Sequence, residues 1–192
     1  MSGERKVSEF DEFVLRCLRQ NVDAFLQHCA ETYGRSVDEA EHAELLDVAP
    51  QVHKGAAPFF TWVKISTLDI DPNSSATYIA DLCDCTKVLG TNRFDFVVCT
   101  EVLEHTRQPF SAVDNIWAVL KPGGYAFVST PYNFRIHGPL PDCWRFTEHG
   151  LRELFKRFEI VELNALETPD RFLMPMHYTL VARKPIGNGS GR

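Results

Sequence analysis

The sequence predicts an α/β fold: a doubly wound, mostly parallel seven-stranded sheet with helices on both faces. Short apolar runs alternate along the chain with stretches of helical spacing, a pattern typical of a parallel sheet covered by helices. One run, Phe94–Thr100, is almost entirely apolar and β-favouring, as expected of a strand buried on both sides. In such folds the ligand lies beyond the carboxyl ends of the strands, so the residues that follow each strand are the candidate site.

Helices are expected in three places. Residues 8–32 carry apolar side chains at three- and four-residue steps, with Ser8 as a suitable N-cap and Tyr33-Gly34 as a stop. Residues 109–120 have the same spacing and end at the turn 121–124, and Thr147 caps a third helix. The strands are expected at Glu44–Val48, Val63–Ile70, Tyr78–Asp81, Phe94–Thr100, Tyr125–Thr130, Phe158–Leu163 and His177–Arg183.

The 192 residues divide into an N-terminal helix over residues 1–35, one domain over residues 36–186 and a tail over residues 187–192. The tail, GNGSGR, is expected to be disordered. The net charge is −6, and the Lys and Arg residues are scattered. This pattern disfavours a nucleic-acid substrate, although a basic groove could still form in the fold. The oligomeric state leaves no mark in the sequence.

The expected location is the cytoplasm. The start of the chain, MSGERKVSEF, has no hydrophobic stretch of the kind found in secretion signals, and no apolar run is long enough to span a bilayer. Cysteines in that compartment are reduced by default. Cys83 and Cys85 form the only close pair, and their spacing matches neither a zinc knuckle nor a thioredoxin motif. We interpret the six cysteines as small, partly buried side chains.

Acidic residues follow four successive predicted strands. A single acid at a strand end means little, but acids on one edge of the sheet suggest a ligand with hydroxyl and amine groups. An acid after the second strand of a doubly wound unit is well placed to hold a ribose diol. The residues in question are Asp47, Asp69, Asp71, Asp81, Glu101 and Glu104, with His105 next to the last.

Two stretches carry a family resemblance. FDFVVCTEVLEH (94–105) and LKPGGYAFVSTP (120–131) resemble class I S-adenosylmethionine (SAM)-dependent methyltransferases, in particular the broad group of small-domain members. The resemblance covers the chain from Glu44 to Lys184. The segment DCWRFTEHGLREL (142–154) is also similar to members with an aromatic-Arg-Phe-Thr stretch before a helix. The resemblance implies SAM as the cofactor and methyl transfer as the activity.

The resemblance also implies roles for the residues at the strand ends. Asp69 matches the acid that holds the SAM ribose, and Asp81 matches the acid near the adenine amine. Glu101 lines the methionine side, next to the sulfonium. The implied cofactor-binding residues are Asp47, Val48, Ala49, Asp69, Ile70, Asp81, Leu82, Thr100 and Glu101.

The chain departs from the family after its first strand. The family has a glycine-rich turn there, acid-x-Gly-x-Gly-x-Gly, whereas this chain has DVAPQVH over residues 47–53. Such glycines let the backbone approach the cofactor closely and start a helix. Either SAM binds with altered contacts, or its binding is weakened or lost. Residues 54–58, KGAAP, indicate an irregular loop where the family usually has a helix.

Glu104 and His105 are the predicted catalytic residues. The resemblance implies that His105 faces the opening where the substrate enters, and an imidazole serves as a general base near neutral pH. The alternative is structural: Glu104 caps or pairs at a helix start, and His105 packs.

A metal is a further alternative for this stretch. Glu-x-x-Glu-His over residues 101–105 resembles the metal-binding stretch of small-RNA 2′-O-methyltransferases, which add a further His downstream. Here the position that aligns with that His carries Cys143, although His137 and His149 are available. We therefore assign no metal.

The predicted substrate residues are Arg135, His137, Trp144 and Arg145. Residues 131–137 would form a substrate loop, and Arg145 could hold an anion. Alternatively, the aromatic side chains anchor the loop on the core and Arg145 pairs with Asp142. The helix at 8–32 either covers the cofactor or only packs against the sheet.

The sequence thus predicts a SAM-dependent methyltransferase that acts on an oxygen, nitrogen or sulfur of a small molecule by in-line displacement. Two alternatives stay open. The missing glycines favour a methyltransferase-like binding module without catalysis, and the stretch 101–105 allows a metal-dependent RNA 2′-O-methyltransferase.

Overall fold

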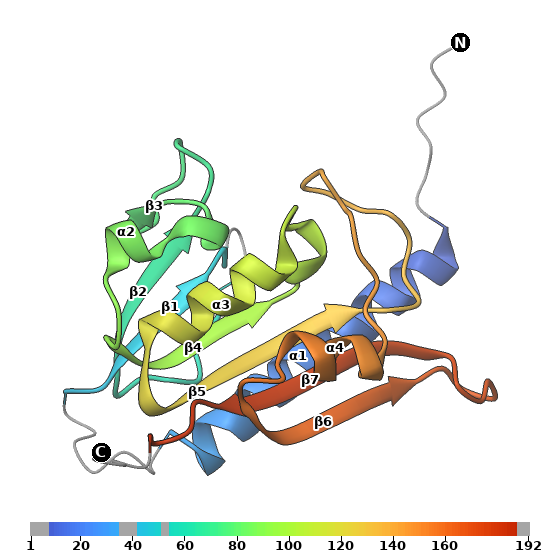
Figure 1. The fold of residues 1–192 in the computed structure, drawn as a ribbon. Helices are drawn as coiled ribbons and strands as arrows, with labels where there is room; N and C mark the ends of the chain where they lie inside the picture. The colour runs from blue at the N-terminus through green and yellow to red at the C-terminus, as the bar shows by residue number, and fades with distance from the viewer. Residues whose placement is uncertain (1–7, 35–41, 51–53, 188–192) are drawn as a thin grey trace.

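The computed structural model describes residues 8–34, 42–50 and 54–187 and contains one seven-stranded sheet in the order β3-β2-β1-β4-β5-β7-β6 (Figure 1). β1 pairs in parallel with β2 and β4, whereas β7 runs antiparallel to β5 and β6. The predicted fold class is confirmed. The strands are β1 (Glu44–Val48), β2 (Lys64–Asp69), β3 (Tyr78–Ile79), β4 (Phe94–Thr100), β5 (Leu120–Pro131), β6 (Glu159–Glu167) and β7 (Pro175–Arg183).

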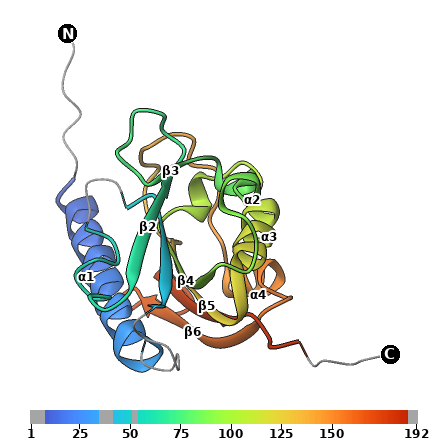
Figure 2. The same cartoon turned by 90° about the vertical axis from the view of Figure 1, so that its left-hand side faces the viewer.

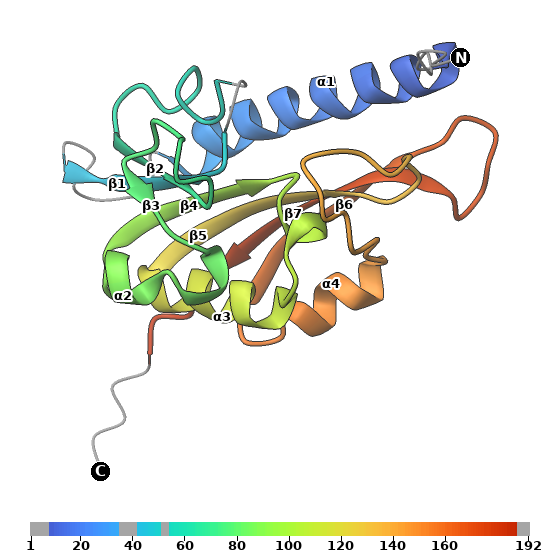
Figure 3. The same cartoon turned by 90° about the horizontal axis from the view of Figure 1, so that it is seen from above.

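Helices cover both faces of the sheet. Helix α1 (Glu9–Thr32) lies alone on one face, and α2 (Thr86–Leu89), α3 (Pro109–Val119) and α4 (Glu148–Leu154) lie on the other (Figures 2 and 3). The predicted N-caps are present, since Ser8 Oγ accepts from the amide of Asp11 and Thr147 Oγ1 accepts from that of Gly150. Among the described residues no helix has the length and apolar character needed to cross a membrane.

The apolar character of β4 follows from its position at the centre of the sheet. Alternate side chains of a strand point to opposite faces, so Val97 and Cys99 join the core under α2, α3 and α4. Phe96 and Val98 join the core under α1, where the ring of Phe127 stacks on Phe60 and the ring of Phe96 is tilted against it. Both cores are needed because a parallel sheet of this kind must be covered on each side.

Some boundaries differ from the sequence prediction. β5 begins at Leu120, which pairs with Phe94, instead of at Tyr125. The expected turn at 121–124 is an irregularity inside this strand, where Gly123 has a φ of +87° and the register shifts. The four-residue helix α2 was not predicted, because four residues are too few to show a helical period. The predicted disordered tail lies, beyond Gly187, outside the described residues.

Candidate active site

A cavity of about 1530 Å³ opens at the carboxyl ends of β1, β2 and β4. It is bounded by α1 on one side and by the loop 134–141 on another. This is where a doubly wound sheet binds its ligand. Eleven of the residues predicted from the sequence line it, namely Val48, Ala49, Asp69, Ile70, Asp81, Leu82, Thr100, Glu101, His105, Arg135 and His137.

Four predicted site residues lie behind the wall of this cavity. Asp47 and Glu104 are buried. Trp144 donates its indole N–H to the carbonyl of Thr106 at 2.8 Å. The guanidinium of Arg145 donates to the Asp142 carboxylate and to backbone carbonyls of the loop. Arg145 thus ties the loop together, and its predicted role in holding substrate stays a prediction.

The turn after β1 lacks the glycines of the family but has a left-handed residue at the first of their positions. Ala49 occupies the position of the first expected glycine and has a φ of +50°, a left-handed conformation that costs a residue with a Cβ about 1–2 kcal/mol. Gly55, with a φ of +52°, lies so close to Asp47 that a Cβ there would be 2.1 Å from Asp47 Oδ2. Gly55, later in the chain, thus packs directly against Asp47; residues 51–53 lie outside the described part.

Asp47 anchors this turn from inside the protein. Its Oδ2 accepts a hydrogen bond of 2.7 Å from the amide of Ala56. Burial raises the pKa of Asp47 to about 6, against the opposing effect of that hydrogen bond. Residues 54–62 contain turns and no helix, which confirms the irregular loop that the sequence predicts.

The residues after β2 and β3 fit a nucleoside. Asp69 Oδ1 accepts from the amide of Asp71 at 2.9 Å, and no described residue bonds its Oδ2. Asp69 lines the cavity, so a free carboxylate oxygen is available to a ribose diol. Asp81 caps the short helix η2 (Leu82–Asp84) by accepting from the amide of Cys83, which fixes its backbone beside the cavity. These residues fit the adenosine part of SAM.

Glu101, directly after β4, is held by a buried network. Its φ is +55°, and its Oε1 accepts from Ser129 Oγ at 2.8 Å and lies 2.7 Å from His177 Nε2. The side-chain amide of Asn21, on α1, contacts His177 Nδ1 at 2.8 Å. Burial would raise the pKa of Glu101, but the interactions with His177 and Ser129 outweigh it and lower the pKa. An ionised carboxylate at this position fits the ammonium group of SAM.

Sequence reasoning missed three residues of this network: Ser129, which lies inside a predicted strand, and also Asn21 and His177. The last two each leave a weak signal. His177 interrupts a strand that is otherwise apolar or small, and Asn21 is a polar residue beside the apolar stripe of its helix. Which partners they meet could not be read from spacing, because they are 156 positions apart.

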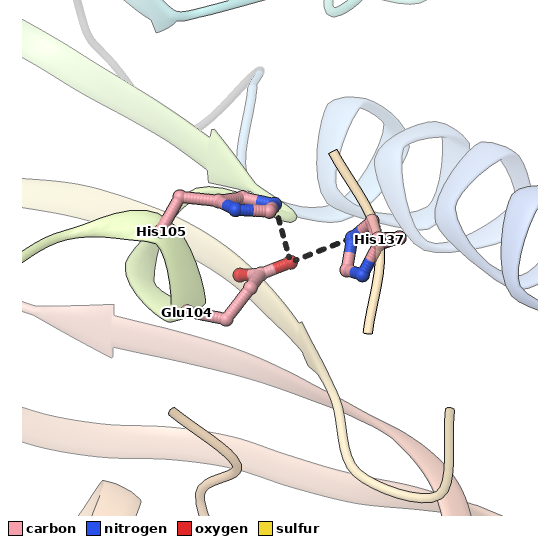
Figure 4. A group of neighbouring side chains, drawn as sticks. All are labelled: Glu104, His105 and His137. Carbon is pink, nitrogen blue, oxygen red and sulfur yellow. Dashed lines mark ion pairs between the residues drawn. The ribbon is translucent and has the colours of Figure 1, made fainter. Parts of the chain in front are cut away.

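A second group lies at the side of the cavity. Glu104 and His105 are on the short helix η3 (Leu103–His105), and His137 comes from the loop after β5 (Figure 4). Glu104 Oε1 lies 3.7 Å from His105 Nε2 and 3.8 Å from His137 Nε2. Neither carboxylate oxygen of Glu104 has a hydrogen-bond partner among the described residues. Burial raises the pKa of Glu104 well above its usual range and lowers that of His105.

Helix α1 contacts both the sheet and the cavity. It packs on the sheet, and Leu18, Val22 and Leu26 also line the cavity. Asp11, near its start, pairs with Arg135 of the loop at 3.4 Å. The cavity is thus closed on this side by a helix from the N-terminal part of the chain.

Comparison with known proteins identifies the family. Residues 14–165 match the family described as the methyltransferase domain. Ubiquinone biosynthesis O-methyltransferase of Vibrio vulnificus (strain YJ016) is 33% identical over 61 residues, which are 32% of this chain and 26% of that protein. The chain therefore spans about a quarter of the length of the curated relatives that it matches.

Solved structures share the fold. A SAM-dependent methyltransferase from Archaeoglobus fulgidus has a TM-score of 0.63 at 14% identity, covering 86% of this chain and 94% of that one. The 1,6-didemethyltoxoflavin-N1-methyltransferase of Burkholderia thailandensis, solved with S-adenosylhomocysteine, has a TM-score of 0.57 at 18% identity, covering 96% and 93%. Because the family match spans most of its length, this chain belongs to the class I SAM-dependent methyltransferases. The predicted family is confirmed, and with it SAM as the cofactor.

Proposed function

We propose that this protein transfers the methyl group of SAM to an oxygen, nitrogen or sulfur atom of a small molecule by in-line displacement. The observation that carries the proposal is Asp69. Its unbonded carboxylate oxygen lies at the end of β2 in a cavity of about 1530 Å³, which it shares with Thr100 and Glu101. This is the arrangement that a bound nucleoside requires at the edge of a doubly wound sheet.

The binding roles follow from the positions of the side chains. When bound, SAM supplies the methyl group together with its leaving group. Asp69 holds the ribose, with Asp81 at the adenine. Glu101, ionised and fixed by His177 and Ser129, holds the methionine ammonium group. The backbone of Ala49, already in the left-handed conformation, lets the turn after β1 face the cofactor as a glycine would.

The acceptor enters between α1 and the loop 134–141. Arg135 and His137 line this opening, and Trp144 and Arg145 support the loop from behind. Holding the acceptor in line with the methyl group supplies most of the catalysis, since alignment alone is worth ~7–11 kcal/mol. When the acceptor is a hydroxyl, His105 receives its proton, helped by the low pKa that burial gives its imidazole, with Glu104 behind it.

Two observations favour a small molecule as the acceptor. The relatives named above act, as their names state, in ubiquinone biosynthesis and on 1,6-didemethyltoxoflavin. The net charge of −6 disfavours binding of a polyanion such as RNA.

Thermal unfolding with SAM and S-adenosylhomocysteine tests the proposal. Each ligand must raise the melting temperature by mass action, and Asp69→Ala should abolish most of the shift. Asp71→Ala is the matched control, because Asp71 is two residues away, is exposed and does not line the cavity. No shift at millimolar ligand would contradict SAM binding and favour the non-catalytic module. Transfer of labelled methyl to RNA, with none to a small-molecule extract, would contradict the substrate class.

A further inference from the structure

We propose that Glu104, His105 and His137 form a binding site for one divalent transition-metal ion, of which Zn²⁺ is the representative. The three side chains offer one carboxylate oxygen and two imidazole nitrogens, and these donor atoms lie within 4.8 Å of one another. Figure 4 shows the carboxylate of Glu104 directed at both rings. The metal set considered from the sequence contained Glu101 and the position of Cys143, and the structure brings neither into this group.

Glu104 is the first argument for a cation. Its side chain is 0% exposed, and both of its oxygens are without a hydrogen-bond partner among the described residues. A buried carboxyl group without partners is costly, so native proteins pair such groups or use them as metal ligands. The two imidazole nitrogens nearest to it are 3.7 and 3.8 Å away, which is too far for hydrogen bonds.

The separation of these atoms suits a cation between them. Zn²⁺ binds imidazole nitrogen and carboxylate oxygen at about 2.0–2.2 Å. Two donor atoms 3.7 or 3.8 Å apart then subtend an angle of roughly 125° at the metal for bonds of about 2.1 Å. Small inward movements of both imidazole rings towards Glu104 Oε1 would bring the angle of each pair to the tetrahedral value.

The second argument for a cation is the partner that each histidine has at Nδ1, on the side of the ring away from Glu104. His105 Nδ1 lies 3.0 Å from the carbonyl of Pro141, and a carbonyl only accepts, so Nδ1 carries the hydrogen. His137 Nδ1 lies 3.1 Å from the carboxylate of Asp142, which imposes the same tautomer. In both neutral rings the lone pair is therefore on Nε2, the atom that faces Glu104. Metal-binding histidines are oriented in this way by a carbonyl or carboxylate behind them.

The donor set determines the kind of metal. Two imidazoles and one carboxylate suit Zn²⁺, Co²⁺ or Fe²⁺, whereas Mg²⁺ and Ca²⁺ prefer oxygen ligands only. Three protein ligands leave a position open, and it faces the cavity because both histidines line it. If an acceptor hydroxyl enters there, as the proposed function has it, the ion lowers the pKa of that hydroxyl in place of His105. Metal binding itself does not depend on that step.

The test is a titration of the full-length, chelator-treated protein with Zn²⁺ in a calorimeter, and with Co²⁺ by visible absorption. We expect one equivalent to bind with a Kd in the micromolar range or tighter. Glu104→Gln and His137→Gln should each weaken binding by more than about 100-fold, as expected on losing one of three ligands. Excess Mg²⁺ should not compete, and Zn²⁺ should raise the melting temperature of the wild type but not that of Glu104→Gln or His137→Gln.

Two control variants sharpen the result. His149→Gln removes a histidine outside the group, and Cys143→Ser removes the thiol at the position where the sequence comparison would place a ligand; both should bind like the wild type. Binding that is lost in Cys143→Ser but kept in His137→Gln would overturn the ligand set. Wild-type binding no tighter than that of Glu104→Gln would overturn the site. His137 lies on a loop, so its variant carries the test should Glu104→Gln fold poorly.

Discussion

His177 Nε2 lies 2.7 Å from Glu101 Oε1. This contact joins the C-terminal strand β7 to the residue directly after the central strand β4. His177 is 0% exposed and is also contacted by Asn21 of α1. One ring thus connects the first helix, the last strand and the wall of the cofactor cavity. Because Glu101 has a left-handed backbone, it needs such partners to keep its carboxylate in place.

Replacing His177 should therefore weaken both stability and cofactor binding. His177→Phe fills the space but leaves the partly buried Glu101 without this donor, at a cost of about 1–3 kcal/mol in the free energy of unfolding. His177→Gln can still donate to Glu101 and should recover part of the loss. Urea unfolding measures the first effect, and S-adenosylhomocysteine titration measures the second. Equal behaviour of the two variants would show that the hydrogen bond to Glu101 does not matter.

Ala49→Gly should relieve the strain in the turn after β1. Ala49 sits at a φ of +50°, which costs about 1–2 kcal/mol, whereas glycine accepts this conformation freely. Glycine also makes the unfolded chain more flexible, which offsets ~0.5–1 kcal/mol of this gain. We therefore expect a small net increase in stability. Ala49→Val is the opposite control and should destabilise by more than 1 kcal/mol, roughly, because β-branched residues tolerate this region worst. Chemical unfolding of the three proteins checks the order.

Gly55→Ala should lower the free energy of unfolding by more than its left-handed backbone conformation alone would cost. The new Cβ would lie 2.1 Å from Asp47 Oδ2, a clash with a buried group, and φ is +52°. Gly90 is a control for backbone strain without a clash, since its φ is +77° and its ψ −167° but nothing lies within 4 Å of a Cβ there. Gly90→Ala should cost about 1–3 kcal/mol, because that backbone region is essentially restricted to glycine, and the clash with Asp47 should make Gly55→Ala cost more. Similar losses in unfolding free energy would mean that the turn after β1 relaxes easily around Asp47.

Asp47 gives the protein a specific dependence on pH. Its pKa is about 6 in the folded state and about 3.9 when unfolded, so between these values the folded protein holds a proton that the unfolded chain has released. The resulting stabilisation is complete below pH ~4 and is lost as the pH rises through ~6. A shift of about two pH units corresponds to on the order of 3 kcal/mol.

Asp47→Asn should remove this part of the pH dependence. Relative to the wild type, the free energy of unfolding of the variant should increase between pH ~4 and ~7, measured by urea unfolding without cofactor. Asp71→Asn, which changes an exposed acid, should leave the wild-type profile unchanged. A constant difference between Asp47→Asn and the wild type across this range would contradict the raised pKa.

The fold and the edge of the site were predictable from local patterns. The apolar run of β4 and the acids that follow the strands are short-range features, and they placed Asp69, Asp81 and Glu101 at one cavity. The irregular loop at 54–58 could also be anticipated, because the glycines with which the family starts a helix after the first strand are absent here.

The contacts that complete the site depend on distant parts of the chain. Gly55 lies against Asp47 because the chain folds back after β1, and Asn21 meets His177 across 156 positions. His137 reaches Glu104 because the loop after β5 turns towards η3. No periodicity carries this information, since it depends on the path of loops in three dimensions.

The side chains by which α1 packs, Leu18, Val22 and Leu26, are also part of the cavity wall. Any occupant of the cavity adds contacts to this helix, so part of the binding free energy holds the helix on the sheet. The amide hydrogens of α1 should therefore exchange with deuterated solvent more slowly when the cavity is filled. A higher concentration of cofactor should thereby lower the fraction of molecules in which α1 has separated from the sheet.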